Sequence, residues 1–92
     1  MDRMLLLANR IVNCSDLYPY TLRQKAWDYE KAADRRILAD RNLAMVKSVL
    51  AEAPEYFHTQ LREALSEETQ AGAIFLKTVG PWLTPFNAFL PF

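Results

Sequence analysis

Glu55 and His58 are the residues whose types and spacing come closest to a chemical site. A glutamate and a histidine three positions apart lie on one face of a helix, as they do in di-iron carboxylate bundles. Such a site also needs glutamates from other helices. Glu55, however, follows Pro54 at the start of a predicted helix and by projection points away from its apolar stripe. We therefore predict no metal, no cofactor and no catalytic residue, and place His58 at the boundary of the helix core.

Cys14 is the only cysteine, and a thiolate nucleophile would need a base beside it. The sequence implies no such Cys–His arrangement, so we interpret Cys14 as a small apolar residue at the end of a helix. A single cysteine excludes an internal disulfide and is typical of a reducing compartment, so we expect a cytoplasmic protein. Glycine-rich phosphate loops, paired-cysteine metal motifs and Gly-x-Ser-x-Gly turns do not occur in the sequence. We predict that the chain is not an enzyme.

Arg35, Arg36 and Arg41 form a cluster of basic residues in the middle of the chain that could contact DNA phosphates. Acidic residues, such as Asp34 and Asp40, are interleaved with them. The whole chain balances eleven basic against eleven acidic residues, whereas nucleic-acid binding needs a basic excess or a basic face. We therefore favour a solvated charged face and keep a DNA-contacting regulator as an alternative.

These residues must be positioned by helices, because the chain holds only two glycines and shows no alternating pattern. We predict helices over 2–14, 21–53, 55–65 and 66–79. The second would begin at a capping box formed by Thr21 and Gln24, and the fourth would begin at a Ser66 cap and stop at Gly80-Pro81. The last two could instead be one rod, since Phe57 and Phe75 have the same helical phase. The expected fold is one all-α domain over 1–92, a small bundle of three to five helices around the long second helix.

The long helix over 21–53 changes its apolar face part-way along. At about 100° per residue, the stripes of its two halves lie about 150° apart, too far for coiled-coil drift to join them. Either the helix breaks near Leu38 to Asp40, or one helix packs against different neighbours at its two ends. The first stripe comprises Leu22, Ala26, Tyr29, Ala33 and Ile37, and the second comprises Ala39, Leu43, Val46, Val49, Leu50 and Ala53.

A further apolar strip on the same helix lies away from the first stripe. It comprises Trp27, Leu38, Met45 and Val49, which share nearly one phase. Tryptophan is enriched at binding hot spots, so we predict that this strip contacts a partner.

The last fifteen residues carry no charge and contain four aromatic side chains. Together these would expose about 800 Å², more than a typical soluble monomer leaves in one patch. We expect the segment over 81–92 to pack across the helices of its own chain or a sister subunit, with a short helical turn from Thr84 to about Leu90. Its predicted interface residues are Trp82, Phe86 and Phe89.

The expected function is that of a non-enzymatic protein-binding module: an adaptor, an assembly factor or a small protein inhibitor. A chain of 92 residues builds a thin core, and zero net charge removes self-repulsion, so a homodimer or larger homo-oligomer is expected. Besides the DNA-contacting regulator, the alternative is a membrane-associated accessory subunit that uses residues 72–92.

Overall fold

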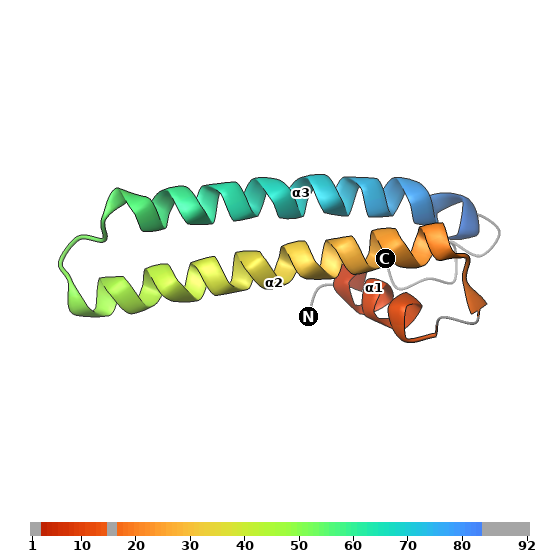
Figure 1. The fold of residues 1–92 in the computed structure, drawn as a ribbon, viewed down its shortest axis with the longest axis horizontal. Helices are drawn as coiled ribbons and strands as arrows, with labels where there is room; N and C mark the ends of the chain where they lie inside the picture. The colour runs from red at the N-terminus through yellow and green to blue at the C-terminus, as the bar shows by residue number, and fades with distance from the viewer. Residues whose placement is uncertain (1–2, 15–16, 84–92) are drawn as a thin grey trace.

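The computed structural model describes residues 3–14 and 17–83 of the chain, and all regular structure within these ranges is helical. The helices are α1 (Arg3–Asn13), α2 (Tyr20–Val49) and α3 (Glu55–Leu83). Figure 1 shows α2 and α3 as a long antiparallel hairpin, with α1 packed against the first half of α2. The prediction of an all-α helical bundle is confirmed.

The hairpin makes the molecule a rod. Its extents are 52 × 24 × 19 Å and its radius of gyration is 16.0 Å, against about 12 Å for a compact chain of this length. The rod has two unlike ends, because α1 lies beside only one of them (Figure 1).

α2 is one continuous helix, so the break considered near Leu38 to Asp40 does not occur. The change of apolar face has a packing cause instead. In the first half, Leu22, Ala26 and Tyr29 are buried in a core shared with α1 and α3. In the second half, α3 is the only helix of the described chain beside α2 (Figure 1), and Leu43 is the buried residue of α2 there.

The predicted capping box at the start of α2 is wrong. The cap position is Pro19, with φ −67° and ψ 156°, and it makes no side-chain capping bond. The Gln24 amide turns forward and donates to the Asp28 carboxylate at 3.0 Å, rather than back toward Thr21. Pro19 offers no side-chain acceptor to the first amides of α2, but its fixed φ suits the residue at which a helix is entered.

α2 also ends at Val49, earlier than the predicted Ala53. Leu50 takes an extended conformation, with φ −111° and ψ 144°, while its amide still donates to the Val46 carbonyl at 2.9 Å. Pro54 disfavours helical geometry at Ala53. The residues between therefore form the loop that reverses the chain into α3.

α3 is the single rod that the shared phase of Phe57 and Phe75 indicated. Ser66 lies inside it and caps nothing, and the predicted stop at Gly80-Pro81 is wrong because the helix runs on to Leu83. Pro81 cannot donate a bond to the Lys77 carbonyl, and this loss falls only in the last turn of the helix. Gly80 has no Cβ to clash with the proline ring, which removes one of the reasons for a helix to end before proline.

The predicted packing of the C-terminal segment falls largely outside the described residues. Phe86 and Phe89 lie beyond them, as does the expected helical turn from Thr84 to Leu90. Trp82 is the penultimate residue of α3.

The main core lies where all three helices meet. Its buried residues are Ala8, Ile11, Leu22, Ala26, Tyr29, Phe75 and Val79. The rings of Tyr29 and Phe75 stack across α2 and α3 with their centroids 5.7 Å apart. Gly72 lets Tyr29 approach α3 closely, since a Cβ at this position would lie 3.1 Å from the ring. Nearer the loop, the buried residues of the described chain are Leu43 and the small Ala64, which do not form a cluster of large side chains.

Candidate functional site

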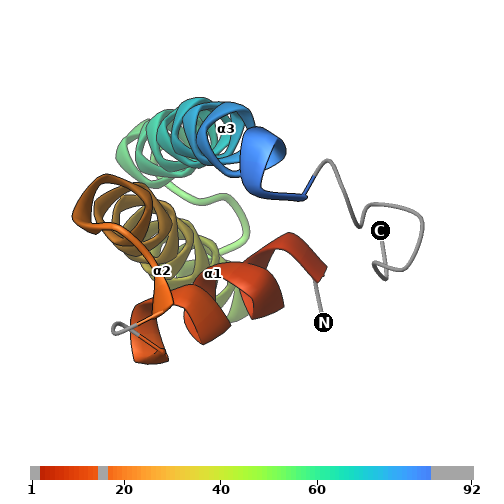
Figure 2. The ribbon, with the colours of Figure 1, turned by 90° about the vertical axis from the view of Figure 1, so that its right-hand side faces the viewer.

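One side of the α2–α3 pair carries no further helix of the described chain, as the end-on view in Figure 2 shows. We call this side the groove face and define it by Trp27, Leu38, Met45 and Val49 on α2 and by Tyr56 and Ile74 on α3. At about 100° per residue, Trp27 lies about 160° around α2 from the buried Tyr29. The groove face thus lies away from Tyr29, with Trp27 at its edge, because Trp27 also lines a pocket beside Val12 of α1.

Two grooves follow the seam between α2 and α3 on this face. The groove at the α1 end of the rod, which we call the proximal groove, has a volume of about 430 Å³ and has Trp27 and Ile74 on its walls. The distal groove, of about 270 Å³ and nearer the loop, is walled by Leu38, Tyr56 and further residues. No residue lining either groove comes from α1. The grooves meet at Arg35 and Glu67, which line both.

The four α2 residues predicted as an interface strip are all exposed; Trp27 and Leu38 line the grooves, and Met45 and Val49 follow them by helical phase. The exposed fraction is 46% for Trp27, 56% for Leu38, 60% for Met45 and 79% for Val49. Leu38 is eleven residues, or three helical turns, from both Trp27 and Val49, which keeps the strip in line. Met45 and Val49 line neither groove but extend the strip toward the loop. That the strip binds a partner stays a prediction.

Sequence reasoning missed the half of this surface that α3 supplies. Tyr56 and Ile74 are both exposed and lie eighteen residues apart, which is five full helical turns. Each precedes a phenylalanine of the inward stripe, Phe57 or Phe75. The shared phase of the two phenylalanines, already evident in the sequence, carries Tyr56 and Ile74 onto one common face.

Charges divide the groove face into bands. The Arg35 Nε donates to the Glu67 carboxylate at 3.1 Å between the two grooves. The Lys31 ammonium lies 5.3 Å from the centre of the Trp27 ring, in the range of a cation–π contact. Apolar side chains therefore flank a central charged band that includes Lys31, Arg35, Glu63 and Glu67.

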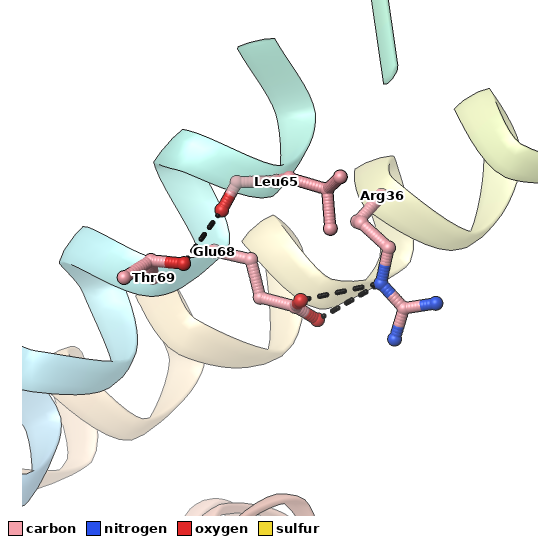
Figure 3. A network of polar contacts seen from close by, with 4 residues as sticks. All are labelled: Arg36, Leu65, Glu68 and Thr69. Carbon is pink, nitrogen blue, oxygen red and sulfur yellow. Dashed lines mark hydrogen bonds and ion pairs between the residues drawn. The ribbon is translucent and has the colours of Figure 1, made fainter. Parts of the chain in front are cut away.

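Two of the arginines considered for DNA contact pair with α3. Besides Arg35, the Arg36 Nε donates to both carboxylate oxygens of Glu68, at 3.2 and 3.3 Å (Figure 3). The same view shows the Thr69 hydroxyl donating to the Leu65 carbonyl at 2.9 Å within α3. Glutamates beside both guanidinium groups weaken the positive potential that phosphate binding requires.

The Glu55–His58 pair lies at the loop end of the rod. The Glu55 carboxylate accepts a bond from Arg62 at 2.9 Å, and His58 is partly buried. Within residues 3–14 and 17–83 no cluster of three or more histidine, cysteine or acidic side chains could hold a metal ion. Cys14, at the other end, is an exposed free thiol.

None of the helices in the described part of the chain has the length and apolar character needed to cross a membrane. No protein-family model, curated protein or solved structure matches this chain. The groove face itself is therefore the basis for a proposed function.

Proposed function

We propose that this chain is a non-enzymatic protein-binding module that receives helices of a partner protein along its groove face. The observation that carries the proposal is the pair of grooves between α2 and α3, walled by exposed apolar side chains from both helices. Grooves of this kind accept the apolar side of an amphipathic helix, which is a common mode of protein recognition.

The exposed apolar area of the groove face supports this proposal. Half-exposed side chains of this size each leave roughly 100 Å² in contact with water. The six that define the face thus present roughly 600 Å² in total, on the two sides of the charged band. Covering that area would contribute about 15 kcal/mol gross, enough to offset the roughly 4–15 kcal/mol cost of association.

The biological role that fits such a module is that of an adaptor, an assembly factor or a small inhibitor, acting by occupying a partner's helices. We also propose a cytoplasmic location, because a reducing compartment keeps an exposed thiol such as Cys14 free.

Two matched leucines provide the test. Leu38 on the groove face and Leu65 on the outer side of α3 are both exposed and lie about level along the hairpin. In affinity capture from the native host, Leu38→Glu should lose the proteins that the wild-type chain retains. Leu65→Glu should retain them. Circular dichroism should show both variants folded, since neither leucine is in the core. Equal capture by both variants would remove the groove face as the binding site.

A further inference from the structure

We propose that the partner is a second copy of this chain, whose groove face packs on the first with the two loops at the same end of the assembly. α2 of each copy then lies over α3 of the other, giving a four-helix seam between two hairpins. This inference rests on the proposed function and names the occupant of that same face.

The exposed apolar area of the groove face is the first argument. The six side chains that define the face present roughly 600 Å² in total. A standard protein interface buries about 800 Å² on each partner. A second copy packed on the same face would therefore bury an area of the size that a stable dimer needs.

The order of residues along the face is the second argument. Trp27 shares the proximal groove with Ile74, and Arg35 pairs with Glu67. Ten residues farther along α2 and eleven residues back along α3, the exposed Met45 and Tyr56 come level in the same way. Each of these pairs thus lies at one level of the rod. A twofold axis along the rod keeps these levels and exchanges the helices. Apolar bands then meet apolar bands, and each Arg35 meets the other copy's Glu67 as well as its own.

The charges of the two helices select this arrangement over the opposite one. α2 lines the grooves with Lys25, Lys31, Arg35 and one acidic residue, Asp28. The charged residues that α3 contributes to the grooves are both acidic, Glu63 and Glu67. With the loops at the same end, the basic side of α2 faces the acidic side of α3. With the loops at opposite ends, α2 would lie on α2 and α3 on α3, so like charges would meet.

The oligomeric state provides the first test. By sedimentation or light scattering, the wild-type chain should have about twice its 10.6 kDa mass at micromolar concentrations. Leu38→Glu would bury an unpaired carboxylate in the seam and should weaken dimerisation at least about 100-fold. Leu65→Glu should leave it unchanged. The inference would be overturned if the wild-type chain is monomeric at about 100 µM, or if Leu38→Glu leaves the dimer unchanged.

Mixed-chain cross-linking tests the arrangement. In a Cys14→Ser background, a tagged Lys31→Cys chain is mixed with a Gln70→Cys chain and oxidised. Both positions line the proximal groove, so the proposed seam brings them together across the two copies. A second mixture pairs Lys31→Cys with Met45→Cys, positions equally far from Leu38 that meet when the loops lie at opposite ends and Leu38 packs on Leu38 of the other copy. Efficient mixed disulfide in the first mixture supports the proposal, and preference for the second contradicts it.

The outcomes separate this inference from the proposed function. If the chain is monomeric but Leu38→Glu still loses a captured protein that Leu65→Glu retains, the second copy is the wrong partner and the binding face stands. If the chain is monomeric and both variants capture the same proteins, the second copy and the binding face both fail.

Discussion

The two ends of the hairpin use the same pair of helices in different ways. At the covered end, where residues 20–33 of α2 and 68–79 of α3 meet α1, Ile11, Leu22 and Phe75 are almost fully buried. At the open end, residues 38–49 of α2 and 55–65 of α3 have each other as neighbours. There Leu43 and Ala64 are buried, while Leu38, Met45 and Tyr56 are exposed.

This difference teaches where the free energy of folding is concentrated. Three helices around stacked Tyr29 and Phe75 rings can exclude water from several large side chains at once. Two helices alone leave one side of each uncovered, so apolar residues there remain in contact with water. The covered end therefore stabilises the fold, while the open end carries much of the apolar surface that a partner could use.

The largest effect should come from Phe75→Ala at the covered end. Phe75 is fully buried and stacks on Tyr29, so its truncation should cost about 3–5 kcal/mol of the free energy of unfolding. A domain of this length has about 5–14 kcal/mol in total, so the variant should be close to unfolding. Urea titration followed by circular dichroism would measure the loss.

Leu76 is the matched control, since it is the next residue of α3 but half-exposed. Leu76→Ala should cost less than about 1 kcal/mol, as surface substitutions usually do. Similar losses from Phe75→Ala and Leu76→Ala would mean that the covered end is not the centre of stability.

Hydrogen exchange should separate the two ends within a single helix. Amides over 22–33 of α2 should open only with global unfolding, because their side chains form the core. Amides over 40–49 should open locally, at a free energy at least about 2 kcal/mol lower. The measurement is best made by mass spectrometry on Leu38→Glu, in which the proposed dimer seam is disrupted. Equal protection along α2 would show that the hairpin opens as one unit.

The sequence predicted the covered end better than the open end. The phases of Leu22, Ala26 and Tyr29 mark a face that must be buried, and that face was recognised correctly. Helix boundaries were harder, because Pro19 and Gly80-Pro81 act through backbone geometry that residue type alone leaves ambiguous. Tyr56 and Ile74 were missed because their common face exists only once α3 is known to be a single rod.

Gly72→Ala tests how tightly the three helices meet at the covered end. Alanine in place of glycine normally stabilises a helix by about 1 kcal/mol. Here the new Cβ would lie 3.1 Å from the Tyr29 ring and 3.5 Å from the Met4 methyl group. Tyr29 is buried and stacked on Phe75, so it cannot move away freely, and the expected gain should vanish. Thermal unfolding would measure this, with Ala73→Gly as the exposed control, expected to lose about 1 kcal/mol.

The smallest effects should come from two neighbouring ion pairs that differ in exposure. The side chains of Arg36 and Glu68 are 31% and 20% exposed, whereas those of Arg35 and Glu67 are 58% and 55% exposed. Double-mutant cycles with glutamine replacements should give a coupling near 1 kcal/mol for the inner pair and a few tenths for the outer pair. Added salt should weaken the outer coupling more, because water and ions reach it freely.

The same cycles can also connect exposure to binding. In the Leu38→Glu background both couplings belong to a single chain, and equal values there would show that the burial of Arg36 and Glu68 adds nothing. In the wild-type background, the proposed seam places a second Arg35–Glu67 pair against the first and removes water from both. The outer coupling should then rise with protein concentration while the inner coupling stays constant. If the outer coupling does not rise with protein concentration, Arg35 and Glu67 remain in contact with water at every concentration. That result would contradict the proposed seam, in which both side chains lose contact with water.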